Sequence, residues 1–176
     1  LLGQDQAAKL VIETGPGAAQ LRLSASVGTL EPAVEVAPGR FEARYLPPKQ
    51  RLPQLAIVAA AAQGASGPLH GWMVLPLWGQ GVARIDTAPG REVTLRAGSR
   101  TFGPVVADGQ GQAQVPISLP PGVGEVFFGK QRIDLGLPPL SRVQAIAASG
   151  ALPCDRQSSV QVRLYVLDEQ VRPRAR

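Results

Sequence analysis

Apolar and polar residues alternate in short runs along most of the chain. Residues 20–27 and 40–45 alternate with a period of two, which is typical of strands with one buried face. Residues 55–62 are apolar throughout and predict a strand buried on both faces, although their alanines would also suit a short helix. No stretch combines a 3.6-residue period with helix caps. The pattern therefore predicts an all-β fold.

Turn residues separate these runs at intervals of about 8–12 residues, as in β-sandwiches. Asp108-Gly109, between two apolar runs, predicts a tight hairpin turn, because glycine accepts a positive φ. Pro76 interrupts the run 69–78 and favours an edge strand, because proline cannot donate a hydrogen bond to a neighbour. The predicted strands are residues 9–13, 20–27, 33–36, 40–45, 55–62, 69–78, 81–86, 91–96, 102–107, 112–119, 125–128, 133–135, 142–147 and 159–167.

The length of 176 residues allows one large domain or two small ones. The break at Trp78-Gly79-Gln80-Gly81 predicts a β-sandwich over residues 1–80 and a second over residues 81–176. A further repeat that begins at about residue 142 is left open. Hydrophobic residues make up 44% of the chain, which is enough for a packed core.

The net charge of +5 comes mainly from arginines, and most of these are spread singly among the alternating segments. Three fall close together at the end, Arg172, Arg174 and Arg176, where a polyanion-binding tail is the alternative to a linker or a strand start. Nucleic acid is not an expected partner. The longest apolar run has eight residues, too few to cross a bilayer, so we do not expect a membrane-spanning chain.

Cysteine and histidine each occur once. Cys154 can form no intrachain disulfide or cysteine-based zinc site, so we expect a free or partly buried thiol, with a disulfide to another chain as the alternative. His70 has no supporting catalytic motif, and no glycine-rich phosphate loop occurs. Asp108, Asp134 and Asp168 are possible hard-cation ligands, but they do not cluster in sequence. We therefore expect no enzyme activity, no metal and no cofactor.

Aromatic residues offer one candidate binding surface. Trp72 and Trp78 are six residues apart and would face the same side of one strand. With Tyr45 they could form a stacking platform for sugar rings, or they could belong to the core. The neighbouring Met73 and Val74 favour the core.

Two parts of the chain resemble bacterial immunoglobulin-like repeats of the invasin and intimin type. Residues 23–30, which end in Val27-Gly28-Thr29-Leu30, and residues 37–48, which run from Ala37-Pro38-Gly39 to Pro47-Pro48, resemble the second half of such a repeat. Residues 55–62 stand where its last strand would be. Residues 143–149 and 159–173 resemble the first half, except that Glu169-Gln170 replaces the usual turn glycine.

This resemblance implies tandem immunoglobulin-like β-sandwich domains in a bacterial cell-surface or envelope protein, extracellular, periplasmic or associated with the outer membrane. The expected role is non-enzymatic: a rigid spacer or an adhesive, protein-interacting module that contacts other subunits or neighbouring domains. The alternative is a carbohydrate-binding module that uses Trp72, Trp78 and Tyr45. No signal peptide is visible at residues 1–5, which is compatible with a processed chain or a piece of a longer one.

Overall fold

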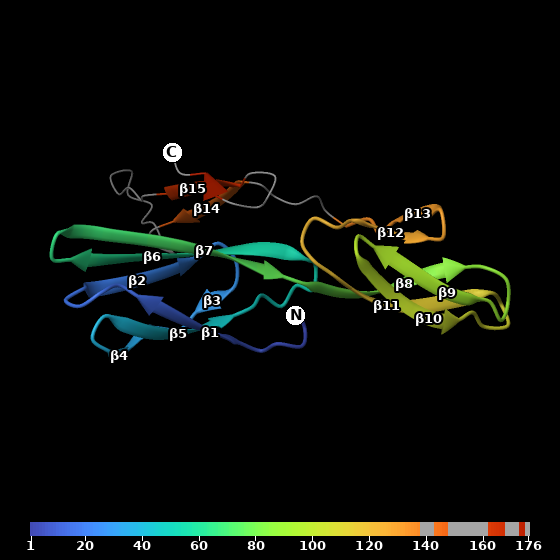
Figure 1. The fold of residues 1–176 in the computed structure, drawn as a ribbon, viewed down its shortest axis with the longest axis horizontal. Coiled ribbons are helices and arrows are strands. Elements are labelled where there is room, and N and C mark those ends of the chain that lie inside the picture. The colour runs from blue at the N-terminus through green and yellow to red at the C-terminus, as the bar shows by residue number, and fades with distance from the viewer. Residues whose placement is uncertain (138–142, 148–161, 168–172, 175–176) are drawn as a thin grey trace, which may run out of the picture. The chain divides into compact units, whose positions relative to one another are not determined.

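Every regular element that the structure describes is a β-strand (Figure 1). The computed structural model describes residues 1–137, 143–147, 162–167 and 173–174. Within these ranges there is no helix, and all paired strands are antiparallel. The prediction of an all-β fold is confirmed.

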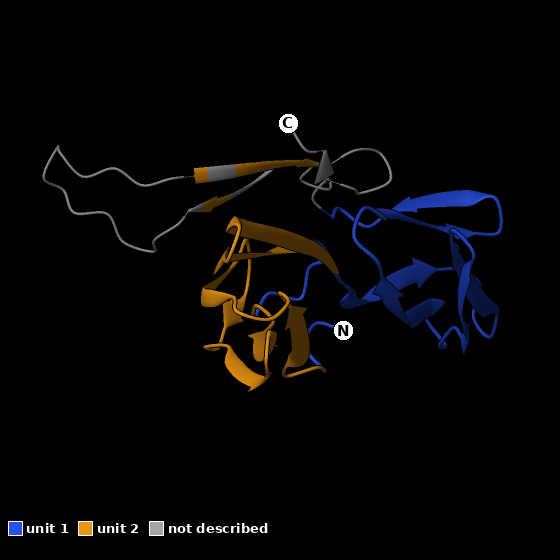
Figure 2. Cartoon of the chain, turned by 60° about the vertical axis from the view of Figure 1, so that its left-hand side comes forward, with its two compact units in different colours: residues 1–4, 49–54, 76–140 blue, residues 5–48, 55–75, 141–176 orange. Residues whose placement is uncertain are grey.

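The chain divides into two compact units, each made of segments that are discontinuous in sequence (Figure 2). Unit 1 contains residues 1–4, 49–54 and 76–140, and unit 2 contains residues 5–48, 55–75 and 141–176. The sequence predicts a boundary near residue 80, whereas the structure divides the chain after Leu75. Residues 1–4 and 49–54, which come earlier in the sequence, also belong to unit 1.

Unit 2 contains two sheets in which residues 5–75 take part. One has the strand order β1-β5-β3, with β4 also paired to β5, and the other has the order β2-β6-β7. The strands are β1 (Ala8–Glu13), β2 (Ala19–Ala25), β3 (Thr29–Leu30), β4 (Val34–Ala37), β5 (Arg40–Leu46), β6 (Gln54–Gly64) and β7 (Gly67–Leu77). The first residue of β6 and the last two of β7 belong to unit 1.

Burial in unit 2 follows the hydrophobic pattern of the sequence. On β5, Phe41, Ala43 and Tyr45 are buried, while Arg40 and Arg44 are exposed. On β6, the residues from Leu55 to Ala59 are all buried, as a strand covered on both faces requires. The alanine-rich run is thus a strand, and the short helix that it would also have suited does not form.

Gly28 lies where the chain leaves β2 and passes against the buried ring of Tyr45. Its φ is +80°, and a Cβ placed there would come within 2.5 Å of the Tyr45 hydroxyl oxygen. Any other residue would have to adopt a left-handed backbone and displace the hydroxyl. This explains the glycine in Val27-Gly28-Thr29.

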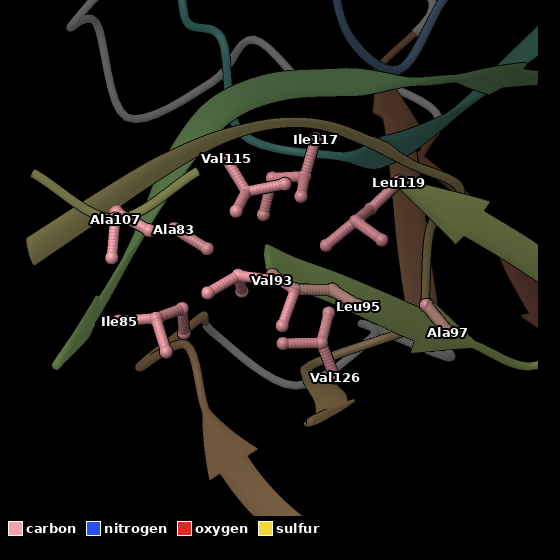
Figure 3. Packing of buried hydrophobic residues seen from close by; sticks show 11 residues of the cluster. Ala83, Ile85, Val93, Leu95, Ala97, Ala107, Val115, Ile117, Leu119 and Val126 are labelled. Carbon is pink, nitrogen blue, oxygen red and sulfur yellow. The ribbon is translucent and has the colours of Figure 1, made fainter. Parts of the chain in front are cut away.

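Unit 1 contains a four-stranded sheet of order β10-β9-β12-β13 and a two-stranded sheet of β11 and β8. The strands are β8 (Gly79–Asp86), β9 (Glu92–Ala97), β10 (Arg100–Val106), β11 (Gln112–Leu119), β12 (Glu125–Phe128) and β13 (Gln131–Asp134). Strands β9 and β11 alternate buried and exposed residues almost without exception. Their buried side chains, with those of β8 and β12, point toward one another and form one apolar cluster (Figure 3).

The turn at Asp108 does not join a hairpin, and this prediction was wrong. Asp108 does organise a tight turn, because its carboxylate accepts hydrogen bonds from the backbone amides of Gln110 and Gln112, each at 2.9 Å. However, β10 and β11 on either side of it belong to different sheets. The chain crosses here from one sheet to the other.

A third sheet in unit 2 has the order β14-β15-β16, with β14 (Val143–Ala147), β15 (Val162–Leu167) and β16 (Pro173–Arg174). Its register pairs Val143 with Val166, so these side chains share a face with Leu164. All three are exposed.

Candidate functional site

Strand β7 is an outer strand of its sheet and is unusually exposed. No described strand lies on its far side, since the sheet order ends β6-β7. All residues from Pro68 to Met73 are exposed, and Trp72 keeps 50% of its surface accessible. Leu69 and Met73 are also among the exposed large hydrophobic residues. The edge-strand prediction made from Pro76 is confirmed.

The two prolines of β7 show which backbone groups face outward. A proline within a paired strand is accommodated where its nitrogen faces away from the neighbouring strand. Pro68 and Pro76 both lie in β7, which is hydrogen-bonded to β6. Because backbone groups alternate along a strand, the N–H and C=O of Trp72 point to the same outer side as the two proline nitrogens. The outward-facing stretch is centred on Trp72.

The edge of β7 carries no formal charge. From Leu52 to Ala83 the chain contains no Asp, Glu, Lys or Arg. By contrast, β1, the outer strand of the other sheet, carries Lys9 and Glu13, which form ion pairs with Glu42 at 2.7 Å and with Arg40 at 3.7 Å. Charged side chains are a usual protection of an edge strand against pairing with another chain. Strand β1 has this protection and β7 does not.

A groove of about 220 Å³ opens beside the same strand. Ile12 of β1, Leu21 of β2 and Leu69 of β7 line it, and the small side chains of residues 60–62 on β6 leave it unfilled. Gly71 contributes no side chain to it. Glu13, Thr14 and His70 also line the groove, so the β7 edge has beside it a recess of mixed apolar and polar lining as well as outward-facing backbone groups.

Tyr45 cannot serve as a sugar platform, which corrects the prediction for this residue. It is 1% exposed, and its hydroxyl donates a hydrogen bond to the carbonyl of Val27 at 2.9 Å. Burial raises the pKa of Tyr45 to about 12. The ring fills the core of unit 2 and has no face to offer to a ligand.

The two tryptophans do not lie on one strand. Trp72 belongs to β7 in unit 2, whereas Trp78 follows the end of β7 and belongs to unit 1. The expectation that Trp72 lies in the core was wrong, because half of its surface is exposed. Trp78 is partly covered, and the guanidinium carbon of Arg100 lies 4.1 Å from the centre of its ring. Of the three predicted aromatic residues, Trp72 is the one with an accessible ring.

The remaining predicted residues include several that the structure does not describe. Arg172, Arg176, Cys154 and Asp168 lie outside the described residues, and of Arg174 only the backbone in β16 is described. His70 is exposed and lines the groove beside β7. Asp134 accepts a hydrogen bond from the Gly136 amide at 2.9 Å and so orders a turn. Within the described ranges, no group of three or more His, Cys, Asp or Glu side chains could hold a metal.

Sequence reasoning missed an open pocket of about 590 Å³ in unit 1, over β12 and β13. Glu125, Phe127, Arg132 and Asp134 line it. Its charged groups already have partners, because Arg132 pairs with Glu125 and Asp134 holds its turn. Phe127 is approached by the guanidinium of Arg96 at 5.9 Å. This pocket is therefore a weaker candidate than the β7 edge.

Comparisons with known protein families, with curated proteins and with solved structures found no match. The part of the chain that the structure describes includes no apolar helix of membrane-spanning length. The class of protein that the fold defines is an all-β chain of layered antiparallel sheets, and its most distinctive surface is the uncharged β7 edge.

Proposed function

We propose that this chain is a non-enzymatic structural module of a bacterial cell-surface or envelope assembly. In this proposal its units are tandem immunoglobulin-like sandwiches similar to invasin and intimin repeats. They act as a rigid spacer that presents a protein-interaction edge. The resemblance of residues 23–30 and 37–48 to such repeats supports the class of protein.

The observation that carries the proposal is the β7 edge of unit 2. Strand β7 is an outer strand of eleven residues, and it contains no Asp, Glu, Lys or Arg. The side chains of Leu69, Trp72 and Met73 on it are exposed. A long, flat and apolar edge without a charge is a template for pairing with another strand, and natural proteins usually avoid leaving one uncovered. Its retention here is best explained if another polypeptide covers it.

The packing of both units supports the spacer role. Among the described residues, every buried side chain of the core is hydrophobic, and none is polar or charged. Such cores hold a fixed geometry because closely packed interiors deform little. Each unit can therefore keep its own geometry, which a spacer requires.

Two measurements test this proposal. Antibodies against the chain should label intact bacteria of the source species, or label them once the outer membrane is permeabilised. Small-angle scattering of the isolated chain should give a maximum dimension that is unchanged by salt and temperature below unfolding. Detection in the cytoplasmic fraction alone would overturn the envelope role, and a dimension that varies with conditions would overturn the rigid spacer.

Trp72 favours a second candidate, carbohydrate binding. Its ring is 50% exposed, and a flat aromatic ring on a strand can stack on the apolar face of a sugar. Titration of a Trp78→Phe variant with a panel of glycans should then quench or shift the fluorescence of Trp72. The Trp72→Ala variant should lose affinity for the same glycan. No response to any glycan would leave the interaction edge as the function of this surface.

A further inference from the structure

We propose that the partner of β7 is β7 of a second copy of this chain, paired antiparallel about a two-fold axis at Trp72. This inference rests on the proposed function of β7 as an interaction edge, and it adds the identity of the partner. Three features of the strand carry it: the spacing of its prolines, the pattern of its side chains and its lack of charge.

The prolines define a symmetric stretch of backbone. Pro68 and Pro76 each lie four residues from Trp72. Neither proline has an N–H to donate, so the backbone hydrogen bonds between two copies of β7 would end at these two residues. A two-fold axis through Trp72 places Pro68 of one copy opposite Pro76 of the other. The Trp72 N–H of each copy then donates to the Trp72 C=O of the other, and the ladder ends at the same distance on both sides.

The side chains are also self-complementary under this axis. Antiparallel pairing about Trp72 places the two Trp72 rings beside each other on one face of the joined sheet, where His70 also lies opposite Val74 of the second copy. On the other face it places Leu69 opposite Leu75 of the second copy, and Gly71 opposite Met73. Cross-strand pairs of aromatic or aliphatic side chains are the contacts that stabilise sheets. Leu69, Trp72 and Met73, which are exposed in one copy, would gain apolar neighbours.

The absence of charge points to a second copy as the occupant. A heterologous partner is usually selected by complementary charges around the contact, and β7 has no Asp, Glu, Lys or Arg to select one. In a symmetric dimer any charge near the axis would meet its own copy and be repelled. A strand that pairs with itself is therefore expected to lack permanently charged side chains at its centre, and β7 has no Asp, Glu, Lys or Arg there.

The test uses opposite charges at residue 72. Sedimentation equilibrium of the full chain, from about 1 μM to about 1 mM, should show a monomer–dimer equilibrium for the wild type. The variants Trp72→Lys and Trp72→Glu should each raise the dissociation constant about a hundredfold or more, because like charges meet at the axis. An equimolar mixture of the two variants should recover dimers, because Lys then lies opposite Glu.

Val11→Lys is the matched control. Val11 is 45% exposed on β1, an outer strand of the other sheet, so this variant adds the same charge at an exposed apolar position away from β7. It should dimerise like the wild type. Cooperative urea unfolding followed by far-UV circular dichroism should confirm that all variants remain folded.

A wild type that is monomeric at about 1 mM, or a mixture that does not recover dimers, would overturn the self-pairing. The same would follow if Val11→Lys abolished the dimer as Trp72→Lys does. These results do not bear on envelope labelling, which tests the proposed function separately. A monomeric chain on the cell surface would leave the interaction role standing and remove the second copy as partner.

Discussion

The cores of the two units are built from different side chains. In unit 1, Val93, Leu95, Val115 and Val126 come from three strands of two sheets and are fully buried. In unit 2, β6 contributes many alanines, and the largest buried side chain is Tyr45, held by one hydrogen bond to the Val27 carbonyl. The small side chains leave the groove of about 220 Å³ beside β7.

This difference means that the units should respond differently to changes in volume and in pH. A core filled by branched aliphatic side chains is sensitive to both removed and added methyl groups. A core with alanines beside a groove accepts added volume there, but it depends strongly on Tyr45, its largest buried side chain. Each unit also holds one tryptophan, Trp78 in unit 1 and Trp72 in unit 2, so single-tryptophan variants report on each unit separately.

The largest expected effect is that of Leu95→Ala in unit 1. Leu95 is fully buried among side chains of both sheets, so its removal leaves a cavity. The free energy of unfolding of unit 1 should fall by about 3 to 5 kcal/mol. Urea unfolding followed by Trp78, in a Trp72→Phe background, measures this loss. In a Trp78→Phe background Trp72 should report an unchanged unit 2, and an equal shift at both probes would contradict the independence of the two cores.

The next effect is a loss of stability of unit 2 at alkaline pH. The pKa of Tyr45 is raised to about 12 from its ordinary value of 10, because burial disfavours the phenolate. The unfolded chain therefore loses this proton first, so stability is intact below pH 10 and falls as the pH rises toward 12. The loss should reach about 2 to 3 kcal/mol.

Tyr45→Phe isolates this contribution, because phenylalanine does not titrate. Urea unfolding at several pH values gives the free energy of unfolding of unit 2 in the wild type and in the variant. The difference between the two should show the alkaline loss, whereas the free energy of unfolding of unit 1 should not differ between them. Absorbance at about 295 nm should also lose a component that titrates near pH 12 in the wild type. A difference that is flat from pH 10 to pH 12 would contradict the burial of the hydroxyl.

The smallest effect comes from the same substitution placed in each unit. Ala113 in unit 1 is 1% exposed and packs within the apolar cluster, so Ala113→Val should cost about 1 to 3 kcal/mol through overpacking. Ala60 lines the groove in unit 2, so Ala60→Val should stabilise by up to about 1 kcal/mol by burying a further methyl group or two. Thermal unfolding of the two single variants measures both. The same sign at both positions would contradict the difference between the cores.

Much of the fold could be predicted because strand identity is a local property here. The alternation of β5 and β9 reads directly from residues 40–45 and 91–96, and β6 was correctly expected to be buried on both faces. The crossing at Asp108 could not be predicted, because a tight turn has the same residues whether the next strand joins the same sheet or the facing one.

The candidate site was predictable only in part. Pro76 indicated an edge, and the stretch without charge from Leu52 to Ala83 was readable, but its meaning depended on the topology. A run such as Trp72-Met73-Val74 is equally apolar in a central strand and at an exposed edge. Whether a second strand lies beside it is decided by contacts far away in sequence.

The sheet that contains β7 ends at β2 on its other side, and this edge limits how large an assembly could grow. Pairing of β7 with its copy would give a continuous sheet that ends on both sides at β2. That strand carries the exposed Arg22 and a register irregularity between Ala19 and Arg22, and Gln20 between them has a φ of 56°. A kinked, charged border is a poor template for a further strand. Growth would therefore stop at two copies. The assembly would be a closed dimer with two-fold symmetry and not an open fibril.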